Sequence, residues 1–162
     1  MSDPLYPLTL FRFQVDFERV SLSDHSTKGP AAVCHGAFSE CTGLEATMEP
    51  KVIKSGGWNY GAQQRAGPTT FATVILKRGI TTKRDLWKWF SQVNETGKYA
   101  FRLNVTIRVA GPAEELPGEA LTIRLFRALP LKFKCADLSA RATEVGIEEL
   151  HLAHEGLSLE SP

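Results

Sequence analysis

Phe101-Arg102-Leu103-Asn104-Val105-Thr106-Ile107-Arg108-Val109 alternates apolar and polar side chains without a break. This is the period of a strand that has one buried face and one polar face. Strands buried on both faces read instead as continuous apolar runs, so the alternation favours an antiparallel sheet with a single covered face. We expect the second face of this strand to be exposed, and it carries Arg102, Asn104, Thr106 and Arg108.

The same period recurs on both sides of this stretch. Breaks rich in glycine, proline and small polar residues separate the alternating segments, as is typical of many short strands joined by turns. The segment around Val145 to Leu152 changes parity, which predicts a β-bulge near Glu148 and Glu149. Further strands are expected over residues 11–17, 33–40, 45–54, 71–76, 121–125, 131–135 and 145–152, with a turn over 111–118.

Two long connections stand out. Residues 18–33 are mostly polar and are predicted to form an extended hairpin or loop. Residues 55–69 form a second, glycine-rich connection, in which aromatic side chains indicate an ordered loop rather than a flexible linker. The residues of interest in it are Gly56, Gly57, Trp58, Asn59, Tyr60, Gly67 and Pro68.

One amphipathic helix is expected over residues 82–94. Leu86, Trp89, Phe90 and Val93 fall at i, i+3, i+4 and i+7 and form one apolar stripe. Thr82 and Asp85 fit the N-cap and N3 positions of a capping box, and Asn94 and Gly97 supply the stop. Trp87 lies beside the stripe, where it either widens the core-facing surface or packs against a neighbouring subunit.

Together these segments predict a mainly β chain. The expected fold is an antiparallel β-barrel or sandwich of about seven or eight strands with one amphipathic α-helix, in a single domain over residues 1–162. The 162 residues carry a formal net charge of +1, which argues against a binder of nucleic acid driven by phosphate contacts. We find neither a membrane span nor a signal peptide, so folding in the cytoplasm is expected.

Motifs for catalysis or cofactor binding are not found, and we expect no enzyme activity, cofactor or metal. GxSxG, GxGxxG and P-loop patterns are missing. His151 and His154 lie three residues apart on a strand, which puts them on opposite faces, and Cys34, Cys41 and Cys135 are widely spread. The carboxylates Glu144, Glu148, Glu149 and Glu155 fit a solvated or intersubunit face better than a catalytic pair.

Basic residues gather around the predicted helix. They could form a patch for nucleic acid, but Asp85 interrupts them and the total charge is balanced, so a face for a partner protein is the better interpretation. These residues are Lys77, Arg78, Lys83, Arg84 and Lys88.

Several stretches, in the right order, resemble one family, the tail tube proteins of contractile phages and phage-derived injection systems. They are GAFSECTGLE over residues 36–45, GGWN over 56–59 with Gly67-Pro68, ILKRGIT over 75–81 with LWKWF over 86–90, and RALPLKF over 127–133 with ELHLAHEGL over 149–157. The order Gly-Pro, where the family often has Pro-Gly, and the length of residues 18–33 depart from the family pattern.

The resemblance implies the phage tail tube fold, which is also that of Hcp, and a structural subunit that forms six-membered rings stacked into a hollow tube for cargo delivery. It implies a sheath protein, baseplate and tube-capping proteins and a cargo effector in the lumen as partners, with no specific recognition of nucleic acid. It further implies assembly in the bacterial cytoplasm and a phage-tail-like particle that is released or anchored to a membrane.

On this basis we assign site residues as hypotheses. The lumen face is Arg102, Asn104, Thr106 and Arg108. The ring-stacking loop is Gly56 to Tyr60 with Gly67 and Pro68. The helix interface is Leu86, Trp87, Trp89, Phe90 and Val93, and the face toward the sheath or another partner is Lys77, Arg78, Lys83, Arg84 and Lys88.

Three alternatives remain. The first is a specialised tube-initiating ring next to the baseplate, which would share the fold and motifs. The second is a ring protein of the related type VI apparatus, although the LKRG and AHEG segments fit the phage-tail branch better. The third is a small β-barrel enzyme or ligand-binding domain, which would need a cavity lined by convergent polar groups.

Overall fold

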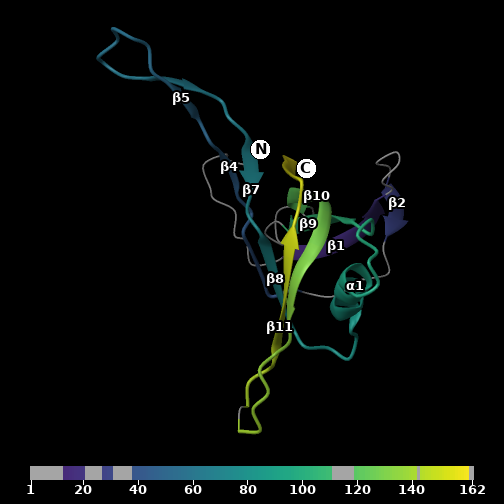
Figure 1. The fold of residues 1–162 in the computed structure, drawn as a ribbon. Coiled ribbons are helices and arrows are strands. Elements are labelled where there is room, and N and C mark those ends of the chain that lie inside the picture. The colour runs from purple at the N-terminus through teal and green to yellow at the C-terminus, as the bar shows by residue number, and fades with distance from the viewer. Residues whose placement is uncertain (1–12, 21–26, 31–37, 111–118, 142, 161–162) are drawn as a thin grey trace, which may run out of the picture.

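The computed structural model describes residues 13–20, 27–30, 38–110, 119–141 and 143–160 (Figure 1). Parts of the predicted 18–33 hairpin, of the predicted strand 33–40 and the turn over 111–118 fall outside these residues. The elements are β1 (Phe13–Val20), β2 (Thr27–Pro30), β3 (Glu40–Thr42), β4 (Ala46–Met48), β5 (Lys51–Ile53), β6 (Gln63–Arg65), β7 (Thr69–Phe71), β8 (Val74–Gly79), α1 (Asp85–Asn94), β9 (Leu103–Ala110), β10 (Glu119–Lys134), β11 (Ile147–Ala153) and β12 (Gly156–Glu160).

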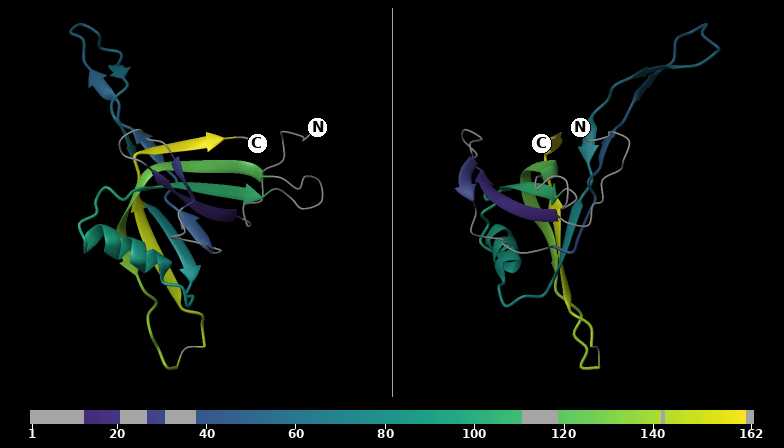
Figure 2. Two further views of the ribbon diagram at one scale, coloured as in Figure 1. Left: turned by 90° about the vertical axis from the view of Figure 1, so that its right-hand side faces the viewer. Right: turned by 180° about the vertical axis from the view of Figure 1, so that it is seen from behind.

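The main sheet is antiparallel throughout. Its strand order is β2-β1-β9-β10-β11-β8-β3, and β12 also pairs with β10. We call β2, β1, β9, β12 and residues 119–128 of β10 sheet A, and residues 129–134 of β10 with β11, β8 and β3 sheet B. The two sheets enclose the core and α1 covers one open end (Figure 2), which confirms the predicted antiparallel β fold with one helix.

Strand β10 belongs to both sheets because it bends sharply at Arg127. This residue has a φ of +50°, a left-handed conformation that is uncommon for a side chain with a Cβ. The pairing of β10 with β9 shifts register between Leu125 and Ala128, so one extra residue forms a β-bulge there. The backbone N–H of Arg127 donates to Oδ1 of Asn104 at 3.0 Å. The predicted strands 121–125 and 131–135 are therefore one bent strand.

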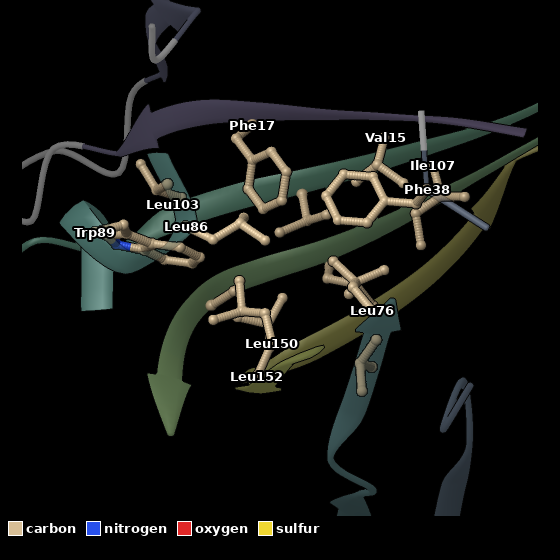
Figure 3. Packing of buried hydrophobic residues seen from close by; sticks show 14 of the residues in the cluster. Val15, Phe17, Phe38, Leu76, Leu86, Trp89, Leu103, Ile107, Leu150 and Leu152 are labelled. Carbon is tan, nitrogen blue, oxygen red and sulfur yellow. The ribbon is translucent and has the colours of Figure 1, made fainter. Parts of the chain in front are cut away.

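The core lies between the two sheets (Figure 3). Val15 and Phe17 of β1 and the inward residues of β9 face Leu150 and Leu152 of β11. Trp89 enters from α1 and meets Phe17 edge-on, with ring centroids 5.7 Å apart. The alternation in Leu103–Val109 and the apolar stripe of the helix therefore predicted buried faces correctly.

A buried ion network joins α1 to sheet B. Arg78 of β8 is 1% exposed and donates to Glu148 of β11 at 2.5 Å and to Asp85 at the start of α1. Burial disfavours the guanidinium charge, but the hydrogen bonds to Asp85 and Glu148 outweigh it and raise the pKa of Arg78. A buried arginine cannot belong to an exposed partner face, so that assignment of Arg78 was wrong.

The same network explains a second error. The pairing of β11 with β8 runs from Ile147↔Gly79 to Leu152↔Val74 without a register shift, so the predicted bulge at Glu148–Glu149 is not formed. Glu148, Leu150 and Leu152 share the buried face, whereas Ile147 is exposed. The alternation of apolar and polar residues appeared to shift by one position only because the carboxylate of Glu148 occupies a buried position of the strand.

The start of the helix also differs from the prediction. Helix α1 begins at Asp85, Arg84 occupies the N-cap position, and no side chain caps the helix there. The carboxylate of Asp85 accepts from Arg78 and from the backbone N–H of Leu86, at 3.1 Å, instead of closing a capping box with Thr82. With ten residues, this described helix is too short to cross a bilayer.

Replacing Trp89 by alanine should remove the largest fully buried side chain. We expect the free energy of unfolding to fall by about 3–5 kcal/mol, because a large cavity opens between α1 and β1. Trp87→Ala, in the same helix but 41% exposed, is the matched control and should cost less than half as much. Urea denaturation followed by circular dichroism measures both, and equal losses would contradict this account of the core.

Glu148→Gln should destabilise the fold by about 1–3 kcal/mol, because it replaces a buried ionic acceptor of Arg78 by a neutral amide. Glu149→Gln changes the adjacent, more exposed residue in the same way and should leave stability close to that of the wild type. Thermal unfolding of the two variants compares them. A Glu148 variant as stable as the wild type would show that the network adds nothing to stability.

Candidate assembly surfaces

The outer face of sheet A carries the residues assigned to the lumen. Arg102, Asn104 and Arg108 are partly exposed there. Thr106 is only 5% exposed, because its short side chain lies between Asp16 and Arg124 in the strand register and longer side chains cover it. Thr106 is therefore not an exposed residue of this face in the isolated subunit.

Arginines and carboxylates pair across the strands of this face. Arg108 lies 2.8 Å from Asp16, and Arg124 lies 3.5 Å from Glu160. At the corner of β10, Glu155 pairs with Arg102 at 2.5 Å and also with Arg127. Exposed pairs of this kind add little stability, but they leave the face polar and close to neutral.

The sequence predicted one row of this face and missed its partners. Only strand pairing places these partners on the same face as the polar row of β9. They are Asp16 of β1, Arg124 of β10, Glu155 of the β11–β12 turn and Glu160 of β12. The polar positions of the predicted strand 11–17 were a signal for Asp16, because alternate residues of neighbouring strands share a face.

The predicted loop 55–69 forms the end of a long hairpin. Strand β4 pairs with β7, and β5 pairs with β6 beyond them, so two short ladders carry the chain far from the core (Figures 1 and 2). The predicted strand 45–54 is thus split at Glu49–Pro50, since proline cannot donate a ladder hydrogen bond. Gln63–Arg65 is strand rather than loop.

The tip of this hairpin presents aromatic side chains to solvent. Trp58 is 46% and Tyr60 is 97% exposed. Gly57 has a φ of +88°, and the N–H of Trp58 donates to the carbonyl of Ser55 at 3.3 Å, which closes a tight turn that favours glycine. Gly56 and Asn59 belong to the same tip.

Gly67 and Pro68 lie in the stem of the hairpin, not at its tip. A Cβ on Gly67 would come within 1.8 Å of the carbonyl oxygen of Glu49, so only glycine fits where the two strands approach. The N–H of Glu49 donates to the carbonyl of Pro68 at 3.1 Å. The stem is therefore a defined structure that sets the direction of the tip.

The residues assigned to the helix interface divide into two groups. Leu86, Trp89 and Val93 are buried in the core, whereas Trp87 is exposed and stacks on Phe90 at 5.7 Å and against Phe133 at 5.5 Å. Only Trp87 and the half-buried Phe90 are available to a partner. Of the basic group, Lys83, Arg84 and Lys88 are exposed, and Lys77 lies 3.3 Å from Glu40.

Three strands of the main sheet have a single partner strand within the described residues. There, β12 pairs with β10, β3 pairs with β8, and β2 pairs with β1. Leu159 of β12 is also largely exposed. Unpaired edges of this kind are a template for a strand of another chain.

Several titratable groups of the described residues pair with one another or are buried. A pocket of about 370 Å³ at the β10 corner contains Arg127 and Glu155, which form an ion pair. The hydrogen bond from His151 lowers the pKa of Glu149, and burial raises the pKa of the Cys41 thiol to about 11. His154 lies 2.9 Å from the carbonyl of Gly156. No group of three potential metal ligands occurs among these residues.

Comparisons with known proteins agree with this architecture. The family model of the T4-like virus tail tube protein gp19 matches residues 9–158. No curated protein sequence matches the chain. A chain in the structure of the anti-feeding prophage baseplate, 6-fold symmetrised, shares 25% identity, with a TM-score of 0.74 over 99% of this chain and 98% of that chain.

Two more distant structures share the fold. A chain of the sheath-tube complex of the extracellular contractile injection system PVC, in the extended state, is 16% identical, with a TM-score of 0.77 over 98% of this chain and 95% of that chain. A chain of the anti-feeding prophage tube terminating cap is 15% identical, with a TM-score of 0.75 over 99% and 95%. The protein therefore belongs to the family of T4-like virus tail tube proteins and is a structural subunit of a tube.

Proposed function

We propose that six copies of this chain, each folded as one domain over residues 1–162, close into a ring with the outer face of sheet A toward a central lumen. The observation that carries this proposal is the open edge of β12, which borders that face. A head-to-tail contact repeated around a ring pairs such an edge with a neighbouring copy and closes the sheet. The number six follows the symmetry of the 25% identical baseplate structure.

The charge pattern supports this orientation. A lumen must be wetted without holding its cargo, and the pairs Arg108–Asp16 and Arg124–Glu160 make the face polar while cancelling most of its charge. In this arrangement Arg102 and Asn104 line the passage near the corner of β10, and Arg108 lines it farther along β9. The role is mechanical and requires no catalytic residue, cofactor or metal.

Rings then stack into a tube through the long hairpin. The hairpin carries its tip away from the core. Trp58 and Tyr60 in this tip are exposed, and aromatic side chains are favoured anchors in interfaces. Partners beyond other copies are a sheath protein around the tube, baseplate and capping proteins at its ends, and an effector in the lumen. Lys83, Arg84, Lys88 and Trp87 are the surface proposed for the sheath. Assembly takes place in the bacterial cytoplasm as part of a phage-tail-like particle.

A second candidate is the specialised ring that initiates the tube at the baseplate. The observation that favours it is sequence identity, which is 25% to the chain in the baseplate structure but 16% to that in the sheath-tube complex. Such a ring has the same fold and lumen but is present in few copies per particle.

Purified wild-type protein should form rings or tubes with a central hole, because its open edges are satisfied only by identical neighbours. Negative-stain electron microscopy over a range of protein concentrations is the measurement. Tubes that lengthen with concentration support the main tube subunit, and single or paired rings support the initiating ring. Monodisperse monomers at high concentration would refute both.

Gly67→Ala should leave rings intact but shorten stacks severalfold, because the added Cβ overlaps the backbone of Glu49 and distorts the stem. Thr69→Ala is the matched control, since it changes an exposed residue of the same stem outside the tip and adds no atoms to it. Particle lengths in micrographs of the two variants give the comparison. Normal stacks from the Gly67 variant would remove the hairpin from the proposed stacking contact.

A further inference from the structure

Two hairpins project from opposite ends of the subunit. The long hairpin, whose tip we define as residues 50–66, leaves at one end, and the connection between β10 and β11 leaves at the other (Figures 1 and 2). In a stack of rings that all point the same way, the tip of each subunit meets the opposite end of a copy in the next ring.

The tip is basic and partly apolar. Lys51, Lys54 and Arg65 are exposed, and residues 50–66 contain no Asp or Glu. Trp58, Tyr60 and Val52 add exposed apolar surface among these cations. Such a surface favours a partner that offers both carboxylates and an apolar contact.

The opposite end has the complementary chemistry. A cleft of about 260 Å³ between β10 and β11 is lined by three carboxylates and one lysine, together with apolar side chains. Beside it, Leu138 is 92% exposed, and Val145 of the lining is 76% exposed. Hydrogen bonding to His151 lowers the pKa of Glu149 and keeps this carboxylate charged. The charged lining residues are Asp137, Glu144, Glu149 and Lys134.

We infer that the basic aromatic tip of one subunit docks into this acidic cleft of a second copy in the adjacent ring. The inference rests on the proposed tube function and names the surface that receives the stacking hairpin. Charge complementarity selects the copy, because the tip of this chain carries the cations and the same chain carries the matching carboxylates. Repetition around each ring adds many weak contacts into a stable stack.

Two charge-reversed variants test the pairing. Lys51→Glu/Lys54→Glu gives the tip the sign of the cleft, and Asp137→Lys/Glu144→Lys gives the cleft the sign of the tip. Each variant alone brings like charges together and should form rings that no longer stack. Mixed in equal amounts, the acidic tip of the first meets the basic cleft of the second, and the basic tip of the second meets the acidic cleft of the first. Stacks should therefore return.

The readout is the length of particles by negative-stain microscopy at low ionic strength, where charge contacts are least screened. Lys83→Glu/Lys88→Glu is the matched control, because it reverses the same number of charges on exposed residues of the helix region and should stack normally. Stacking by either reversed variant alone, or failure of the mixture to stack, would overturn the inference. Rings that still form in these samples would leave the proposed function intact.

A second measurement uses the unmodified protein. A carbodiimide, which joins a lysine amine directly to a carboxylate, should link Lys51 or Lys54 of one copy to Asp137, Glu144 or Glu149 of another. Mass spectrometry of digested stacks identifies these peptides. Their absence from stacks that yield other lysine-carboxylate links between copies would also contradict the docking of tip and cleft.

Discussion

The bend of β10 at Arg127 is the constraint on which the rest of the structure depends. One strand must pair with β9 and β12 before the bend and with β11 after it. The left-handed Arg127, the bulge beside it and the turn from β11 to β12 let both neighbours change direction together. Asn104 accepts the N–H of Arg127, and the N–H of Glu155 donates to the carbonyl of Phe126 at 2.9 Å. This corner therefore fixes the orientation of the charged face of sheet A relative to the hairpins that project from sheet B.

Local periodicity predicted the parts of the fold in which polarity and burial agree. The alternation from Phe101 to Val109 and the spacing of Leu86, Trp89 and Val93 each predicted a buried face correctly. In both elements the apolar side chains are the ones that are buried in the core. The rule fails where a charge is buried. Arg78 and Glu148 read as surface residues, yet each supplies the other's counter-charge in the core. Only the pairing of β8 with β11, which is not local in sequence, makes that burial possible.

The candidate site was predictable to a similar extent. Aromatic residues among glycines identified the exposed tip around Trp58. Large apolar side chains are unusual in an exposed loop unless the loop contacts a partner. One arm of the stem was predicted, because β4 and β5 lie within the expected strand 45–54. The other arm was missed at β6, whose three residues are all exposed, so no alternation marks it. The ionic partners of β9 were missed for a different reason. Asp16 and Glu155 are distant in sequence, and a register cannot be derived from one strand alone.

Charge is distributed differently on the outer face of sheet A and at the two ends of the subunit, and this difference bears on the proposed assembly. On the face of sheet A, the charges of arginines and carboxylates neutralise one another within one subunit. This face therefore offers little net charge that could attract a neighbouring subunit. At the ends, the cations of the tip and the carboxylates of the cleft are separated by the body of the molecule and cannot cancel internally. Two like ends would repel each other, whereas unlike ends attract. If the tip and the cleft meet as we propose, a subunit adds to a stack in one orientation only, which a tube with distinct ends requires.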